Sequence, residues 1–308
     1  MPKITLAQFE SKLCDPPANV AKAIPMIRQA GLDGSDMIMF PEMFTTGYEL
    51  SIVGPRITEL AEPVNGPTIT ALREAAKQAG VYVVAPIALY HDDLPGVPFN
   101  SAVLIDREGN VAGVYDKQHL WALERFYFRG GNGTPVFQTD FGTIGIMICY
   151  DMGYPEVARM LALQGAQIVL CPSAWCEPDH DVWDINVPAR ALENTVFLCA
   201  VNRYGREQDL YMGGHSKVCD PRGRVVAELP DEGEGVLNVE IDLADVVPTG
   251  RPARTCAIAD RSYTARYCCP DVKCRDRIIV FPSKEEDDDP ALVSYKNRKY
   301  ISSSRSVP

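Results

Sequence analysis

The sequence predicts an α/β fold built from two β-sheets that are covered by helices. Apolar runs of strand length recur along the chain, and segments with apolar residues at helical spacing separate several of them. The later part is rich in short strands joined by glycine-containing turns. So many strands with so few helices are typical of two packed sheets.

The expected strands are short apolar or alternating runs, many of them rich in β-branched residues. In chain order they are Ile4–Phe9, Met37–Phe40, Val81–Pro86, Ser101–Asp106, Val111–Tyr115, Ile144–Ile148, Ile168–Cys171, Val196–Val201, Ser216–Asp220, Val225–Glu228 and Val236–Asp242. The expected helices have an apolar face. They are Ala18–Gln29, Thr68–Gln78, Glu156–Leu163 and Trp183–Asn194.

Length and composition favour one large domain with an extension. The chain has 308 residues, of which 46% are hydrophobic, and we expect a domain over residues 1–245. Residues 246–308 form the expected extension, packed partly on the core or on a partner subunit. The apolar segment Ile278–Phe281 calls for burial, whereas the acidic run Glu285–Asp289 is expected to be mobile.

The net charge of the chain limits the kinds of partner that we expect. The net charge of −11 argues against nucleic acid and against anionic membranes as partners. Met1–Phe9 leads directly into a strand pattern, and no apolar stretch reaches the length of a membrane span. We therefore expect a cytoplasmic protein that acts on a small molecule.

The ten cysteines predict neither a disulfide scaffold nor a metal site. They are too sparse for a scaffold, and several lie in apolar strands, so most are expected to be reduced. Near the C-terminus the spacing lacks paired C-x2-C elements, and His215 is distant in sequence. The cysteines whose clustering suggests a metal site are Cys171, Cys176, Cys256, Cys268, Cys269 and Cys274.

Three polar residues follow apolar strands. Glu42, Lys117 and Cys149 each come directly after such a run. Taken alone, Cys149 resembles an inert core thiol such as Cys171 or Cys199. Strand ends can converge on one edge of a sheet, where ligands usually bind, so together the three indicate a site. The helix expected after Cys149 predicts that its N-terminus favours the thiolate.

At this point the sequence resembles the nitrilase superfamily of carbon–nitrogen hydrolases. The resemblance extends from about Lys3 to about Asp242. It rests on Phe40-Pro-Glu42 with Gly47-Tyr48, Tyr115-Asp-Lys117-Gln-His119-Leu120, Glu124 with Phe128 and Gly131, Ile148-Cys149-Tyr150-Asp151, Pro155-Glu156, Pro172-Ser173-Ala174-Trp175, Arg190-Ala-Leu-Glu-Asn194, Asn202-Arg203 and Gly214-His-Ser216.

The resemblance implies a four-layer α-β-β-α sandwich and a Cys-Glu-Lys triad. Cys149 is then the nucleophile that forms a thioester, and Glu42 is the general base and acid. Lys117 and the backbone N–H of Tyr150 stabilise the oxyanion. Glu124 is a second carboxylate that orients the substrate or Lys117. No cofactor is needed, because side chains handle every proton and charge.

The resemblance also implies assembly: subunits of the family pair across a helical layer, so we expect a homodimer or a higher homo-oligomer. Glu156–Leu163, directly after the nucleophile, is the helix expected to form this face. It carries apolar residues on more than one side.

For the substrate, we expect an amide or an N-carbamoyl compound that releases ammonia or an amine. Aromatic residues beside the motifs are the expected walls of an apolar pocket: Tyr48, Trp121, Phe126 and Trp175. Relatives that hydrolyse N-carbamoyl-D-amino acids have an arginine pair after the nucleophile, and this chain has none there. Gly153 suggests extra room instead.

Two alternative functions stay open. A nitrilase would convert a nitrile to an acid and ammonia, although nitrilases more often have Cys-Trp-Glu than the Cys149-Tyr-Asp151 found here. A non-catalytic binding or scaffold module is disfavoured because all four catalytic positions are filled. A papain-like protease would need His215 as its base, but this histidine lies in a turn motif, Met212-Gly-Gly-His-Ser216.

Overall fold

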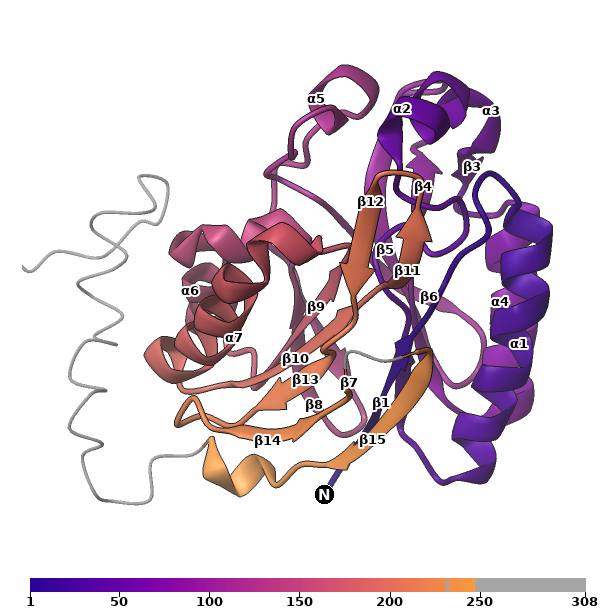
Figure 1. Ribbon diagram of the computed structural model, residues 1–308. Helices are drawn as coiled ribbons and strands as arrows, with labels where there is room; N and C mark the ends of the chain where they lie inside the picture. Colours follow the sequence, from indigo (N-terminus) through magenta and orange to yellow (C-terminus); the bar gives the residue numbers. More distant parts are fainter. Residues whose placement is uncertain (231–232, 247–308) are drawn as a thin grey trace, which may run out of the picture. The chain divides into compact units, whose positions relative to one another are not determined.

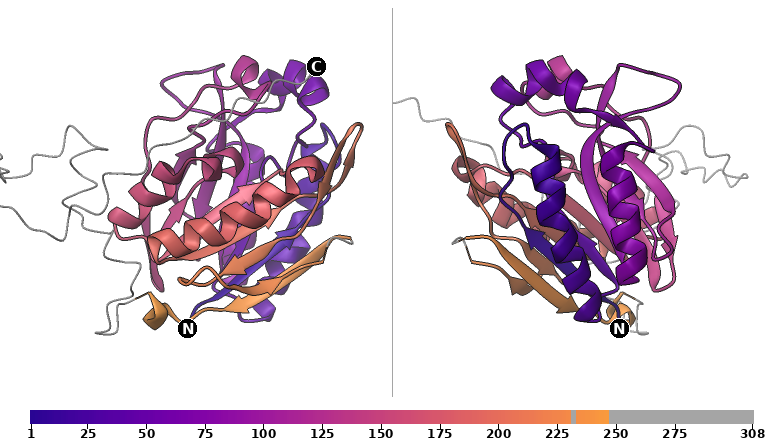
Figure 2. Two further views of the ribbon diagram at one scale, coloured as in Figure 1. Left: turned by 60° about the vertical axis from the view of Figure 1, so that its left-hand side comes forward. Right: turned by 90° about the vertical axis from the view of Figure 1, so that its right-hand side faces the viewer.

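The computed structural model describes residues 1–230 and 233–246, in which two β-sheets pack face to face and helices cover both outer faces (Figure 1). The two views of Figure 2 show one helical layer on each side of the paired sheets. This arrangement confirms the predicted α-β-β-α sandwich. Apart from Val246, the predicted extension over residues 246–308 lies outside the described residues and stays a prediction. No helix in the described ranges is long and apolar enough to cross a membrane.

The first sheet has the order β15-β1-β2-β4-β5-β6, and β3 pairs with the C-terminal end of β4. Its strands β1, β2 and β4 are parallel, whereas β15, β5 and β6 join as antiparallel neighbours. The strands are β1 (Lys3–Gln8), β2 (Met37–Met39), β3 (Glu62–Pro63), β4 (Tyr82–Tyr90), β5 (Pro98–Ile105), β6 (Val111–Asp116) and β15 (Gly235–Glu240).

The second sheet has the order β14-β13-β10-β9-β8-β7 and is parallel over β8, β9 and β10. Strands β11 and β12 form a separate hairpin. The bounds are β7 (Val136–Thr139), β8 (Gly142–Ile146), β9 (Ile168–Ser173), β10 (Phe197–Asn202), β11 (Tyr204–Glu207), β12 (Leu210–Gly213), β13 (Lys217–Cys219) and β14 (Val225–Glu228).

Helices α1 (Pro16–Leu32) and α4 (Pro67–Ala79) cover the first sheet, and α6 (Pro155–Leu163) and α7 (His180–Asn194) cover the second (Figures 1 and 2). These are the four expected helices. The helix α4 begins with proline at its first position and ends at Gly80, which takes the left-handed conformation that suits glycine. Short helical turns were not expected: α2 (Leu50–Val53), α3 (Ile57–Leu60) and α5 (Glu124–Tyr127).

The pleat of the first sheet divides its side chains between two cores. Met37 and Met39 point into the core shared with the second sheet, whereas Ile38 points into the core under α1 and α4. Neighbouring strands follow the same rule, with Val84 on the inner face and Val83 on the outer one. Since side chains alternate along a strand, both faces must be apolar. Burial of both faces explains why the sequences of these strands are continuous apolar runs.

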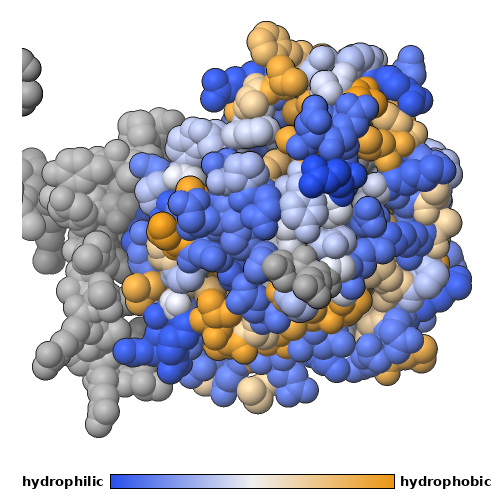
Figure 3. Space-filling model, in the orientation of Figure 1, coloured by the Kyte–Doolittle hydropathy of each residue, from blue (hydrophilic) through white to orange (hydrophobic). Residues whose placement is uncertain are grey.

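The face shown in Figure 3 is mostly hydrophilic, with apolar side chains gathered low on it over β14 and β15. Val225, Val226 and Val236 are 44%, 49% and 45% exposed there. Both strands are sheet edges, so only one side of each is paired within the described chain. The apolar side chains that sequence patterns assign to strands are therefore not all buried.

Several short strands were missed by the sequence analysis. The strand β7 is only partly buried, and its short sequence carries little apolar periodicity. The hairpin of β11 and β12 alternates polar and apolar residues over only four positions in each strand. Conversely, β4 continues to Tyr90, beyond the predicted end, because antiparallel pairing with β5 runs from Val83 to Tyr90.

A buried ion pair supports the loop that carries Glu42. Arg203, directly before β11, is fully buried and pairs with Glu207, the last residue of β11. Its guanidinium also donates to the backbone carbonyls of Glu42 and Met43, at 3.3 and 3.1 Å. Glu207 in turn accepts from the backbone N–H groups of Tyr48 and Glu49. The pair therefore fixes the backbone from Glu42 to Glu49.

Removing Glu207 should destabilise the protein. We expect Glu207→Ala to lower the free energy of unfolding by about 3–5 kcal/mol, because the Arg203 charge would stay buried without its partner. Urea unfolding measures this change. The matched control is Glu59→Ala, which removes a carboxylate that is 73% exposed and 3.8 Å from Arg56 and should cost less than about 1 kcal/mol. Equal effects of the two substitutions would contradict the proposed support.

Candidate active site

The ends of three strands bring Glu42, Lys117 and Cys149 to one site. Glu42 follows β2, Lys117 follows β6, and Cys149 follows β8. The first two come from one sheet and the third from the other, so the site lies where the sheets face each other. The sequence predicted this convergence from the strand ends.

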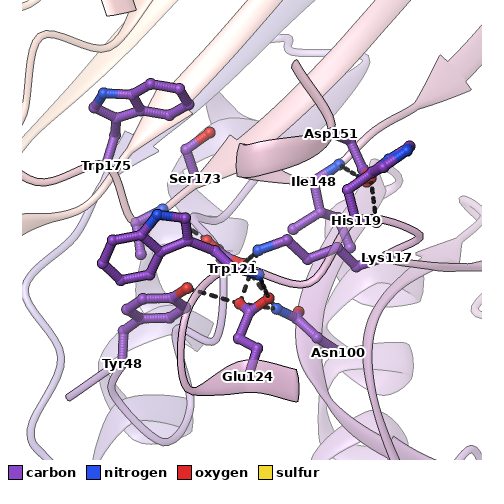
Figure 4. A network of polar contacts seen from close by, with 12 residues as sticks. Tyr48, Asn100, Lys117, His119, Trp121, Glu124, Ile148, Asp151, Ser173 and Trp175 are labelled. Carbon is purple, nitrogen blue, oxygen red and sulfur yellow. Dashed lines mark hydrogen bonds and ion pairs between the residues drawn. The ribbon is translucent and has the colours of Figure 1, made fainter. Parts of the chain in front are cut away.

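The Lys117 ammonium lies between two carboxylates (Figure 4). Its Nζ is 2.6 Å from Glu42 Oε1 and 2.7 Å from Glu124 Oε1, and all three side chains are 0% exposed. Burial alone would lower the pKa of Lys117, but the charges of Glu124 and Glu42 outweigh it and raise that pKa well above its usual value. The lysine therefore stays charged.

Further donors satisfy the two carboxylates. Asn100 Nδ2 on β5 donates to Glu42 Oε1 at 2.7 Å and to Glu124 Oε1 at 3.2 Å. The Tyr48 hydroxyl donates to Glu124 Oε1 at 2.7 Å (Figure 4). The Ala174 backbone N–H donates to Glu42 Oε2 at 3.0 Å. These contacts hold Glu42 and Glu124 in place, and Glu124 is paired with Lys117.

Cys149 lies in a strained turn at the end of the second sheet. Its φ is 47°, a left-handed conformation that is uncommon for residues other than glycine. Asp151 holds this turn: one of its oxygens accepts from the Ile148 N–H at 3.0 Å and from the Tyr115 hydroxyl at 2.7 Å. The other accepts from the His119 N–H at 2.9 Å. Asp151 therefore ties the turn to the segment of Lys117.

The prediction that a helix N-terminus favours the thiolate of Cys149 was wrong. A short 3₁₀ turn, Cys149–Gly153, separates the thiol from α6. Burial raises the pKa of Cys149 well above its usual value, and the nearby negative charge of Glu42 raises it further, while Lys117 opposes both. At neutral pH the resting thiol is protonated, so attack on a substrate requires a base.

Cys149 opens onto a pocket of about 240 Å³. The lining residues are Tyr48, Trp121, Cys149, Tyr150, Gly153, Ala174, Trp175, Cys176, Asp179, Val182 and Asn186. Three of the four predicted aromatic walls are among them. Phe126 is not: it is 81% exposed on the outer side of α5, so proximity to a motif was misleading. A Cβ at Gly153 would meet only the Tyr150 ring, at 4.0 Å, which agrees with the expected room.

Sequence reasoning missed Asn100, Asp151 as a support, and Asp179 as a pocket residue. A polar residue in the apolar strand β5 was the available signal for Asn100. The other two thiols that were compared with Cys149 behave as expected of core cysteines: Cys171 and Cys199 are buried inside strands. Burial raises the pKa of Cys171 to about 12.

Comparison with known proteins identifies the family. A family model for carbon–nitrogen hydrolases matches residues 3–251. A probable nitrilase of Schizosaccharomyces pombe is 36% identical over 247 residues, which cover 80% of this chain and 90% of the relative. An N-carbamoylputrescine amidase of Arabidopsis thaliana is 34% identical over 254 residues, 76% of this chain and 84% of the relative. The chain belongs to the carbon–nitrogen hydrolase family.

Solved structures agree with this assignment. A variant of the amidase from Nesterenkonia sp. AN1 superposes with a TM-score of 0.72 at 29% identity, over 82% of this chain and 94% of the other. That variant shows covalent addition of the acetamide moiety of fluoroacetamide at its active-site cysteine. The present chain is accordingly a thiol-dependent hydrolase of carbon–nitrogen bonds of the amidase kind, as the sequence predicted.

The charge of Glu42 should control the ionisation of Cys149. Because the negative charge of Glu42 raises the pKa of the thiol, Glu42→Gln should lower that pKa. Alkylation of Cys149 by iodoacetamide, followed by mass spectrometry across pH, measures this shift. The rate of alkylation should then begin to rise at a lower pH in the variant.

The control for this measurement is the same titration in Cys149→Ala, which reports alkylation of the other cysteines. An unchanged or higher midpoint in Glu42→Gln would show that Glu42 does not set the state of the thiol.

Proposed function

We propose that Cys149, Glu42 and Lys117 hydrolyse a small amide or N-carbamoyl compound through a thioester. The observation that carries this proposal is a thiol in the lining of a pocket, within electrostatic reach of a buried carboxylate and a buried ammonium. Glu42 takes the thiol proton, and Cys149 attacks the carbonyl carbon. The negative charge moves to the carbonyl oxygen, where Lys117 and the N–H of Tyr150 stabilise it.

The remaining steps return the enzyme to its resting state. The carbon–nitrogen bond breaks, and the leaving nitrogen takes the proton from Glu42, which releases ammonia or an amine. Glu42 then removes a proton from water, and the resulting hydroxide attacks the thioester. The acid leaves, and Cys149 regains its proton. Glu124 acts in this scheme by holding Lys117 and Tyr48.

The pocket favours a neutral or cationic substrate. None of its described lining residues is lysine or arginine, so no cation is available there for a free carboxylate. Asp179 is the one acidic residue among the described lining residues, and its carboxylate forms no ion pair with another described residue. The walls are mostly aromatic or aliphatic. We expect a short apolar chain that ends in a neutral group or an amine, and neither nucleic acid nor membrane as a partner, in a cytoplasmic setting.

A nitrile is the second candidate substrate, because the relatives of Schizosaccharomyces pombe and Pyrococcus abyssi are named as nitrilases, at 36% and 35% identity. The same thiol can attack a nitrile carbon. Turnover rates on an amide and a nitrile of the same chain length decide between the two candidate substrates.

Ammonia release from a substrate panel tests the function. The panel contains neutral primary amides, N-carbamoyl amines, carboxylate-bearing amides and nitriles of equal chain length. We expect turnover of the first two classes, and a loss of roughly 10⁴-fold or more in kcat for Cys149→Ala. Cys199→Ala is the matched control, which should lose stability but not rate.

Two outcomes would contradict this proposal. Turnover of nitriles alone would favour the second candidate, and full activity in Cys149→Ala would remove the nucleophile from the mechanism. For the charge preference, Asp179→Asn should raise the KM of an amine-bearing substrate and leave that of a neutral amide unchanged. Equal effects on both substrates would show that Asp179 does not select charge.

We further infer that subunits associate through the outer face of α6 and α7. On α6, Val157, Ala158 and Leu161 are buried within the subunit, whereas Met160 and Leu163 are only partly buried. On α7, Ile185 is 66% exposed. Apolar side chains on the solvent side of a helical layer are typical of association surfaces. A homodimer or a higher homo-oligomer would cover them.

A charge on this face should disrupt assembly and activity together. We expect Met160→Glu to lower the mass measured by light scattering and to lower kcat, because α6 follows the turn of Cys149 directly. The control is Thr70→Glu, which adds the same charge at an exposed position of α4 in the opposite helical layer. A fully active monomer would contradict the coupling.

A further inference from the structure

Outside the active site, Glu177, His180 and His215 form a cluster of potential metal ligands. One ligand atom from each, a carboxylate oxygen or a ring nitrogen, lies within 4.8 Å of the other two. The centroids of the two imidazole rings are 4.0 Å apart, and the rings are tilted by 56°. All three residues are partly exposed. The reactions proposed above use none of the three.

Tertiary structure brings these residues together, since His215 is far from the other two in sequence. An isolated β-bridge between Cys176 and Met212 joins the segment before α7 to the end of β12. The indole of Trp183 donates to the carbonyl of His215 at 3.1 Å, which fixes the turn after β12 against α7. The cluster therefore rests on two regular elements rather than on loops alone.

Gly213 makes room for the carboxylate. A Cβ at this position would lie 2.7 Å from Glu177 Oε1. Any larger residue would therefore push the carboxylate of Glu177 from its place beside the histidines. This close approach ties the residue type at 213 to the position of Glu177.

The imidazole ring of His180 has no hydrogen-bond partner in the described part of the chain. Both of its nitrogens are buried, and neither has a hydrogen bond within the described chain. The nearest carboxylate oxygen, Asp184 Oδ1, is 3.6 Å from Nε2 and already binds Lys217 Nζ at 2.6 Å. Buried polar atoms are normally satisfied, so an unpartnered imidazole close to a second imidazole and a carboxylate points to a ligand that binds all three.

The local charge also suits a cation. The acidic residues around the cluster are Glu177, Asp184 and Glu228, and the one described lysine among them is Lys217. With neutral imidazoles, this set carries a net charge of −2. A divalent ion would balance it.

We propose that Glu177, His180 and His215 bind a divalent transition metal of the zinc class, with water completing the coordination. Two imidazoles and one carboxylate are a ligand set that zinc accepts. Metal–ligand distances of about 2.0–2.2 Å require the three side chains to close slightly around the ion, and their partial exposure permits this movement. None of these three ligands is a cysteine.

Such an ion would stiffen one wall of the substrate pocket. Cys176 and Asp179 line that pocket. In sequence, Cys176 directly precedes Glu177, and Asp179 directly precedes His180. The indole of Trp175 also donates to the carbonyl of Asp179, at 2.7 Å. The metal therefore has a structural role beside the pocket and takes no part in bond cleavage.

Metal titration of the tag-free, reduced, full-length protein tests the site. Zinc binding is measured by calorimetry, and cobalt binding by absorbance. We expect His180→Ala and His215→Ala each to weaken zinc binding at least tenfold. Glu177→Gln should also weaken zinc binding, because it removes the charge of the side chain while keeping nearly the same side-chain shape. The matched control is His91→Gln, because His91 pairs with Asp116 elsewhere and should not contribute.

The cobalt spectrum separates this site from the cysteines. Nitrogen and oxygen ligands give no thiolate-to-cobalt charge-transfer band, whereas binding by the ten cysteines would give one. In a zinc-soaked crystal we expect an anomalous peak between His180 and His215. Zinc affinity that is unchanged in both histidine variants, or a peak at sulfur atoms alone, would overturn the proposal. Neither readout depends on hydrolytic activity, so a failure here is distinct from failure of the proposed function.

Discussion

The buried ammonium of Lys117 is the interaction on which the rest of the site depends. It is fully removed from solvent together with Glu42 and Glu124. Burying an ion costs several kcal/mol after relaxation, and only close partners with satisfied oxygens offset this cost. The fold must therefore deliver two carboxylates, the amide of Asn100 and several backbone N–H groups to one point. Small shifts of the strands that carry them would leave a buried charge unpaired.

This requirement explains why the polar supports extend so far along the chain. Arg203 and Glu207 fix the backbone that follows β2, and Asp151 fixes the turn of Cys149 to the segment that follows β6. Each support joins parts of the chain that are distant in sequence. The two sheets are thus connected at the site by hydrogen bonds as well as by the apolar core between them.

The sequence predicted what is encoded locally. The four covering helices and most strands follow from apolar periodicity, and Glu42, Lys117 and Cys149 stand directly after such runs. Asn100, Asp151 and the Arg203–Glu207 pair were not recognised, because their importance lies in partners that only the tertiary structure supplies. The wrong placement of Phe126 has the same origin: a residue next to a motif can point outward. The ionisation of Cys149 was mispredicted because burial and a neighbouring carboxylate outweigh a helix terminus.

The resting charge of the site constrains the proposed chemistry. With a protonated thiol, one ammonium and two carboxylates, the buried cluster carries a net charge of −1. Proton transfer from Cys149 to Glu42 moves this negative charge to sulfur, and attack on the carbonyl moves it on to oxygen. The total charge never changes, and the charge travels around an ammonium that stays in place. A buried site tolerates such a displacement far better than the creation of a new charge, because the surrounding dipoles need little reorganisation. The high pKa of the thiol therefore fits a nucleophile that is deprotonated only when a substrate is ready to accept the charge.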